Sequence, residues 1–193
     1  EISCSLVGSE MCIRDRSEAD LSDRIEVRLA NGLGAIENTD KIDTIVIAGM
    51  GGILISEILE AGKGKLGHVK RLILQPNNHE ESLRQWLVNH QFVIKKEEIL
   101  LEAGKFYEII VAEPLSKLMT EKLSVNDLTF GPFLSKEKST VFQQKWQKEL
   151  NTLNKIIARL PEEQAEKRQE VLNQIARIEE AVSYTHLTLP TKA

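Results

Sequence analysis

Residues 42–60 constrain the fold more than any other part of the chain. Residues 42–48 form a short, mostly apolar run with many β-branched side chains, which is typical of a buried parallel strand. Residues 53–60 have helical spacing, with Leu54, Ile58 and Leu59 on one stripe. Glycines separate the two, so the segment predicts a strand, a turn and a helix of an α/β sheet. Ligands bind such sheets at the carboxyl ends of strands, so we expect the functional site at residues 49–52.

The neighbouring segments extend this unit into a sheet. Alternating polar and apolar residues predict a first strand, and Pro76 ends a second buried one. Asn77 or Asn78 is expected to cap the helix that follows and ends near residue 89. The last two strands have no helix between them and should pair antiparallel. The four further strands are expected at residues 23–29, 71–75, 92–94 and 106–112.

The spacing of apolar residues changes after a loop-rich connector, which is expected at residues 115–134. Apolar residues from Phe142 to Leu160, and again from Val171 to Val182, are spaced by alternating threes and fours. Pro161 separates the two runs, which predicts an antiparallel coiled-coil hairpin over residues 135–182. Lysine dominates the first helix and glutamate the second. The charges fit either pairing across the hairpin or contact of the basic helix with a polyanion.

Bulk composition excludes several classes of protein. The formal net charge of −4 argues against general polyanion binding by charge alone, and no apolar run approaches the roughly 20 residues that cross a bilayer. The two cysteines, Cys4 and Cys12, lie near the amino end. The body of the chain therefore has no cysteine-ligated metal site, and a reducing, cytoplasmic setting is expected. Residues 1–16 and 183–193 resemble translated sequencing-adapter tails, so residues 17–181 are expected to be the natural segment.

Each candidate binding residue has a plain structural alternative. Glycines at 49–52 allow a ligand to approach the backbone, but they also suit a tight turn. Asn31 and Leu33 could contact a nucleoside or belong to an ordinary Asn-Gly turn. Gln75 and Asn77 could hydrogen-bond a base edge, or they could only end a strand and cap a helix.

Two further side chains have the same ambiguity. His79 is expected to be an exposed residue of the first helical turn rather than a catalytic base. Tyr107 could stack on a base or pair with an aromatic side chain across the strands. No nucleophile triad, metal-spaced cluster or carboxylate pair stands out in the sequence. This absence favours chemistry that depends on positioning, such as methyl transfer from a sulfonium donor.

The order and spacing of these motifs resemble a known family. The motifs are Ala48-Gly49-Met50-Gly51-Gly52, Leu74-Gln75-Pro76-Asn77, Tyr107-Glu108-Ile109 and Phe130-Gly131-Pro132 before the hairpin. Together they resemble the bacterial tRNA (adenine-N1)-methyltransferases of the TrmK type, which methylate the adenine at tRNA position 22 with S-adenosylmethionine. The resemblance implies a Rossmann-like class I methyltransferase domain over residues 17–114, followed by the hairpin.

The resemblance also implies roles for individual residues. It places a base pocket at Gln75, Pro76 and Asn77. It implies tRNA contacts by Tyr107, Lys145, Lys148 and Lys155, and no metal. A monomer is expected, although the same heptads could pair between chains. The donor-binding residues that it implies are Asn31, Gly32, Leu33, Ala48, Gly49, Met50, Gly51 and Gly52.

One departure from the family bears on activity. The family begins with two further strands, which would lie between the strands at 23–29 and 42–48. We therefore expect a partial domain with its first strand misplaced or unpaired and an exposed sheet edge that favours aggregation. Donor binding should be lost or very weak, and this chain inactive. Two other functions stay open, a methyltransferase-like domain with another substrate and a non-catalytic tRNA-binding or coiled-coil module.

Overall fold

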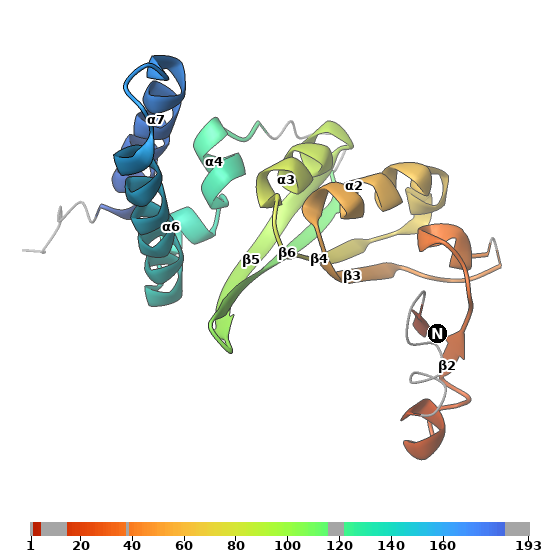
Figure 1. The fold of residues 1–193 in the computed structure, drawn as a ribbon. Helices are drawn as coiled ribbons and strands as arrows, with labels where there is room; N and C mark the ends of the chain where they lie inside the picture. The colour runs from red at the N-terminus through yellow and green to blue at the C-terminus, as the bar shows by residue number, and fades with distance from the viewer. Residues whose placement is uncertain (1, 5–14, 38, 116–121, 184–193) are drawn as a thin grey trace, which may run out of the picture. The chain divides into compact units, whose positions relative to one another are not determined.

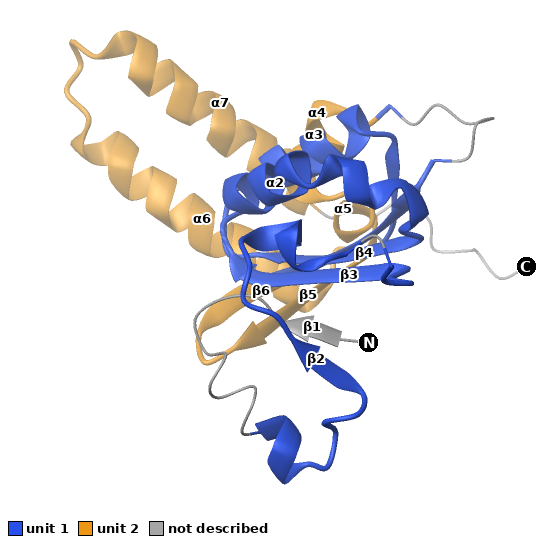
Figure 2. Ribbon diagram, turned by 90° about the vertical axis from the view of Figure 1, so that its right-hand side faces the viewer, with its two compact units in different colours: residues 1–96, 108–122 blue, residues 97–107, 123–193 orange. Residues whose placement is uncertain are grey.

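The computed structural model describes residues 2–4, 15–37, 39–115 and 122–183 (Figure 1). The chain divides into two compact units (Figure 2). Unit 1 comprises Glu1–Lys96 and Glu108–Lys122, and unit 2 comprises Glu97–Tyr107 and Leu123–Ala193. Most of the two expected tails lies outside the described residues, so that expectation stays a prediction.

A mixed four-stranded sheet carries the α/β part of the fold. Its strand order is β3 (Thr44–Met50), β4 (Arg71–Pro76), β6 (Lys105–Pro114), β5 (Phe92–Glu102). β3 and β4 pair parallel, whereas β4 and β6 pair antiparallel. The turn between β5 and β6 has positive φ at both Ala103 and Gly104, as tight hairpins prefer. The predicted α/β class with an antiparallel edge is therefore confirmed.

Two helices cover one face of this sheet, α2 (Gly52–Ala61) and α3 (Glu80–Asn89) (Figures 1 and 2). Ile45 and Ile47 of β3 are buried, but Val46 between them is 64% exposed. Successive side chains of a strand point to opposite faces, so only one face of β3 is buried. The prediction that this strand is buried throughout was wrong, because α2 and α3 cover only one face of the sheet (Figures 1 and 2).

The buried stripe of α2 differs from the predicted one. Gly52, Ile55 and Leu59 are buried, whereas Leu54 is 47% exposed. Gly52 sets this rotation, because its amide bonds the carbonyl of Asn78 and must face the neighbouring loop. The six-residue 3₁₀ segment η2 (Lys63–His68) follows the helix.

An ion pair joins α3 to the sheet inside unit 1. Arg84 Nη2 donates to Glu108 Oε2 at 2.6 Å, and both side chains are almost fully buried. Near the end of α3, the rings of Trp86 and His90 stack with centroids 4.0 Å apart. His90 also contacts the Glu60 carboxylate of α2, which links the two helices.

The strand that was predicted at residues 23–29 is β2, and it lies outside the main sheet. β2 (Ile25–Val27) pairs parallel with β1 (Ile2–Cys4), and β3 stays at the edge of its own sheet. That the strand is misplaced and the sheet edge exposed because two family strands are missing stays a prediction. Further strands between β2 and β3 stay a prediction. The 3₁₀ segment η1 (Gly32–Ala35) connects this region to β3.

Unit 2 contains two short helices before its hairpin, α4 (Val125–Phe130) and α5 (Leu134–Glu137). The Ser124 side chain accepts from the Asp127 amide while the Asp127 carboxylate accepts from the Ser124 amide, which is a capping box. Gly131 ends α4 with a φ of 84°. The connector at residues 115–134 is therefore not the loop that was predicted, because a capped helix forms within it.

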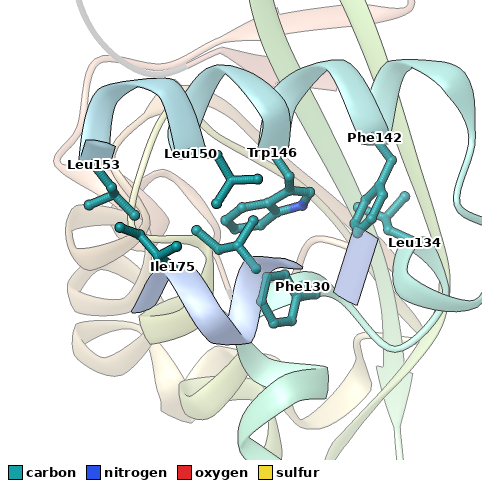
Figure 3. Close-up of a cluster of buried hydrophobic side chains, with 8 residues drawn as sticks. Phe130, Leu134, Phe142, Trp146, Leu150, Leu153 and Ile175 are labelled. Atoms are coloured by element: carbon teal, nitrogen blue, oxygen red, sulfur yellow. The ribbon is translucent and has the colours of Figure 1, made fainter. Parts of the chain in front are cut away.

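The long helices α6 (Thr140–Arg159) and α7 (Ala165–Val182) pack against each other as a hairpin (Figure 2). Trp146 of α6 lies edge-on to Phe130, with ring centroids 4.7 Å apart (Figure 3). Arg168 donates to the carbonyls of Ile157 and Leu160 and so satisfies the end of α6. The buried cluster comprises six of the predicted apolar positions, Phe142, Trp146, Leu150, Leu153, Ile175 and Ile178, together with Phe130 and Leu134, which were not predicted. The remaining predicted positions, Ile157, Leu160, Val171 and Val182, are half-buried.

Candidate functional site at two strand ends

The predicted glycine turn and the predicted base-pocket loop lie together at the carboxyl ends of β3 and β4. Ala48 is paired with Gln75 and Met50 with Pro76, and the register shifts between these two pairs. Beyond the strands, the Asn77 amide donates to the Met50 carbonyl at 2.7 Å. The Gly52 amide donates to the Asn78 carbonyl at 2.8 Å. Backbone hydrogen bonds therefore hold the two loops against each other.

The glycines of the turn are required for different reasons. A Cβ at position 51 would lie 2.8 Å from Asn78 Oδ1, and one at position 52 would lie 2.3 Å from the His79 carbonyl oxygen. These two glycines are explained by the close approach of the neighbouring loop. Gly49 instead has a φ of 79° and open space around its Cβ position. A ligand could approach the backbone at Gly49.

Gln75 links the two loops through its side-chain amide. Its Oε1 accepts from the Gly49 amide at 2.8 Å, and its Nε2 donates to the Pro76 carbonyl at 3.0 Å. Nε2 also lies 3.1 Å from Asn77 Oδ1. Sequence analysis placed these residues together but gave no sign of this network.

The start of α3 differs from the predicted cap. His79, with a φ of 53°, is the N-cap residue, and its side chain makes no cap hydrogen bond. The prediction that Asn77 or Asn78 is the cap residue was wrong, because the helix begins one residue later than expected, and the Asn77 side chain accepts from Gln75. His79 is exposed at the start of the helix, as predicted.

The structure does not bring Asn31, Gly32 and Leu33 to the glycine turn. Gly32 lies so close to Ile58 that a Cβ would be 2.9 Å from its Cγ2. Leu33 is buried, and its side chain lies where a Cβ of Gly62 would be. Both contacts are at the carboxyl half of α2, whereas Gly51 caps its amino end. The role of these three residues in donor binding stays a prediction.

The predicted tRNA-binding residues all belong to unit 2. Lys148 and Lys155 are exposed on α6, seven residues apart and hence on the same side of the helix. Lys148 Nζ lies 5.6 Å from the ring centroid of Phe106, and Lys145 Nζ lies 5.3 Å from that of Trp146. Phe106 precedes the half-buried Tyr107 in β6 and was missed in the sequence. A basic helix face with an aromatic ring beside it is suited to contact nucleic acid.

Two other kinds of site are absent from the described residues. Over that part of the chain, no three His, Cys, Asp or Glu side chains are grouped so that they could hold a metal ion. The helices that the structure describes include none with the length and apolarity needed to cross a membrane.

Comparisons with known proteins agree on one family. Residues 10–180 match the family model described as "TrmK: tRNA (adenine(22)-N(1))-methyltransferase". The tRNA (adenine(22)-N(1))-methyltransferase of Bacillus subtilis is 38% identical over 178 residues, which are 89% of this chain and 74% of that protein.

Solved structures of similar proteins share the fold. Streptococcus pneumoniae Sp1610 in complex with S-adenosyl-L-methionine is 48% identical with a TM-score of 0.85, and the match covers 94% of this chain and 79% of that one. The B. subtilis m1A22 tRNA methyltransferase TrmK is 35% identical with a TM-score of 0.78, over 94% of this chain and 80% of that one. The α/β part described above is therefore a Rossmann-like methyltransferase fold.

Proposed function

Because the chain belongs to the TrmK family of tRNA (adenine(22)-N(1))-methyltransferases, it is an S-adenosylmethionine-dependent tRNA methyltransferase, and we propose that the ends of β3 and β4 form its reaction site. One observation supports this location. The expected donor-binding turn at Gly49 and the expected base-pocket loop at Asn77 are neighbours. A donor and a target base would have to meet at such a place, outside the carboxyl ends of parallel strands.

The donor and the space at Gly49 are compatible. S-adenosylmethionine supplies a methyl group on a positively charged sulfur that is already a good leaving group. Gly49 offers exposed backbone with open space beside it, where a bound molecule could lie against the chain. Ala48 and Met50 flank this position, and neither carries a charge. We propose that these three residues hold the donor.

The reaction places few chemical demands on the protein. N1 of neutral adenine has a lone pair and no hydrogen, so no base has to remove a proton before the new N–C bond forms. The product ring carries a positive charge, and S-adenosylhomocysteine leaves. The loop after β4 would orient the adenine so that N1 faces the methyl group. Alignment of this kind can supply about 7–11 kcal/mol of a barrier.

We propose that the basic face of α6 holds the tRNA backbone. Lys148 and Lys155 are exposed, and Lys145 lies three residues before Lys148 on the same side. Lysines bind phosphates and release counterions, which gives salt-dependent affinity. Phe106 and Tyr107 could add stacking on an unpaired base.

The proposal also covers the hairpin, the oligomeric state and the location in the cell. The heptad spacing and the packing of α6 on α7 support a coiled-coil hairpin. We propose a monomer, because the apolar face of each helix is buried within the hairpin. We propose a cytoplasmic location, because tRNA is the substrate.

Methyl transfer to defined tRNA tests the function. Unmodified tRNA transcript is incubated with the chain and labelled S-adenosylmethionine, and the modified nucleotide is mapped. Any label is expected at adenine 22 and not in a transcript with guanine there. Since weak donor binding was predicted, the assay covers a wide range of donor concentrations, and the B. subtilis relative serves as a positive control. Label at another nucleotide would contradict the proposal. No label while the relative labels the same transcript would instead support the expected loss of donor binding.

Charge reversal on α6 tests the tRNA surface. The double variant K148E/K155E is expected to bind tRNA at least about tenfold more weakly, with a shallower salt dependence. The control K167E makes the same change at an exposed lysine of α7 and should retain affinity. K148E/K155E lowers the net charge by four units and K167E by two, so a loss in K167E of about half that of the double variant, in free energy, would mean that only the net charge matters.

A further inference from the structure

We infer that Gln75 is a positioning residue, whose side-chain amide fixes the glycine turn of β3 to the loop after β4, rather than a contact to the target base. The inference rests on the proposed function for the importance of this site. It departs from the role that the resemblance implies for Gln75. The hydrogen bonds of its amide and the pairing of β3 with β4 carry the argument.

The amide of Gln75 is almost fully used within the protein. Its two N–H groups have two acceptors, the Pro76 carbonyl at 3.0 Å and Asn77 Oδ1 at 3.1 Å. Its oxygen accepts from the Gly49 amide at 2.8 Å. A glutamine amide has two donor hydrogens and two acceptor lone pairs, so one lone pair remains. To read a base edge with its nitrogen, Gln75 would first have to break one of these bonds.

The partners also fix which way the amide points. The Gly49 amide can only donate, and the Pro76 carbonyl can only accept. A flipped amide would place N–H against N–H at Gly49 and oxygen against oxygen at Pro76. The same reasoning orients Asn77, since its oxygen faces Gln75 Nε2 and its amide nitrogen therefore faces away from Gln75.

The strand pairing explains why a side chain is needed at this point. The register of β3 on β4 runs from Ala48–Gln75 directly to Met50–Pro76, so Gly49 has no partner in the ladder. Such a bulge leaves the extra residue, Gly49, unpaired. Pro76 has no backbone N–H, so it could not donate a hydrogen bond to Gly49 in any case. Gln75 supplies the acceptor that the ladder does not offer to the Gly49 amide. The open backbone at Gly49 thus has its conformation set by Gln75.

Two variants and a control test this role. Q75A removes all three hydrogen bonds, and Q75E keeps the size and the acceptor but cannot donate when ionised. Q85E makes the same chemical change at an exposed residue of α3. The first readout is hydrogen exchange at the Gly49 amide by NMR, which needs neither donor nor tRNA. Calorimetry with S-adenosylhomocysteine and the separate KM values for donor and tRNA follow.

The expected pattern separates positioning from base contact. In Q75A, the Gly49 amide should exchange at least about tenfold faster, and the KM for the donor should rise by a similar factor. Q75E keeps the acceptor for the Gly49 amide and loses only the two bonds that Nε2 donates, so its Gly49 amide should exchange more slowly than that of Q75A. The KM for tRNA should stay within about twofold, and Q85E should match the native chain in all readouts. Unchanged Gly49 exchange, or a rise in the KM for tRNA alone, would overturn the inference. If the native chain labelled a nucleotide other than adenine 22 but Gly49 exchange still depended on Gln75, the proposed function would fail and the positioning role would stand.

Discussion

Asp40 illustrates how one carboxylate holds the segment between β2 and β3. It accepts hydrogen bonds from Arg28 Nη2 at 3.0 Å and from the Glu37 amide at 2.7 Å. The Arg28 guanidinium, followed by the Glu37 amide, holds the pKa of Asp40 below its usual value. The hydrogen bonds of Arg28 to Asp40 and then to Glu26 raise the pKa of Arg28.

This pKa shift predicts a loss of stability in acid. Because the pKa of Asp40 is lower in the folded state, its ionised form stabilises the fold above the unfolded pKa of about 3.9. That contribution should disappear as the pH falls through the folded pKa. Urea unfolding of the native chain and D40N between pH 7 and pH 3 measures it, and D40N should lose less stability on acidification. Parallel pH profiles for the two proteins would contradict the assignment.

Single residues also mark how far the sequence could predict the site. Gly49 and Asn77 could be placed together because parallel strands end at one sheet edge. The role of Gln75 could not be predicted, because it depends on a register shift that no local pattern encodes. The position of Asn31 could not be predicted either, since it depends on how η1 packs against α2.

At the scale of elements, the long repeats were the most predictable. Apolar residues spaced by threes and fours predict one buried stripe per helix, and the structure buries six of them, Phe142, Trp146, Leu150, Leu153, Ile175 and Ile178. Short elements were less predictable from the sequence, because tertiary contacts determine where they begin and which face they bury. α4 was missed although Ser124 and Asp127 have capping-box spacing, and the stripe of α2 was rotated by the contact of Gly52.

Two residues of α7 give a matched test of the hairpin core. Ile175 is buried, and Leu172, three residues earlier, is 45% exposed. I175A should lower the free energy of unfolding by about 2–5 kcal/mol, because it leaves a cavity between the helices. L172A should change it by no more than about 0.5 kcal/mol. Both are measured by chemical denaturation, and similar losses would mean that the two helices do not pack as described.

At the scale of the whole molecule, the two units share a pair of strands. The division falls within β5, after Lys96, and within β6, after Tyr107. Neither unit can therefore unfold completely without disrupting strands that continue into the other. We expect one cooperative transition for the chain.

Each unit contains one of the two tryptophans, Trp86 in unit 1 and Trp146 in unit 2. The variants W86F and W146F therefore follow one unit each by fluorescence. Their urea midpoints should agree with the circular dichroism of the same variant. Two separated midpoints within one variant would show that the units unfold independently.

Because their surroundings differ, these two tryptophans should also differ in fluorescence emission. Trp146 lies among apolar side chains, and its indole nitrogen has no hydrogen-bond partner within the described residues. Trp86 stacks on the His90 ring and donates to the Glu60 carboxylate at 3.3 Å. Emission at short wavelength should therefore come mainly from Trp146, and emission that the stacked His90 ring quenches should come from Trp86. A single spectrum of the native chain can then follow both halves while tRNA is added.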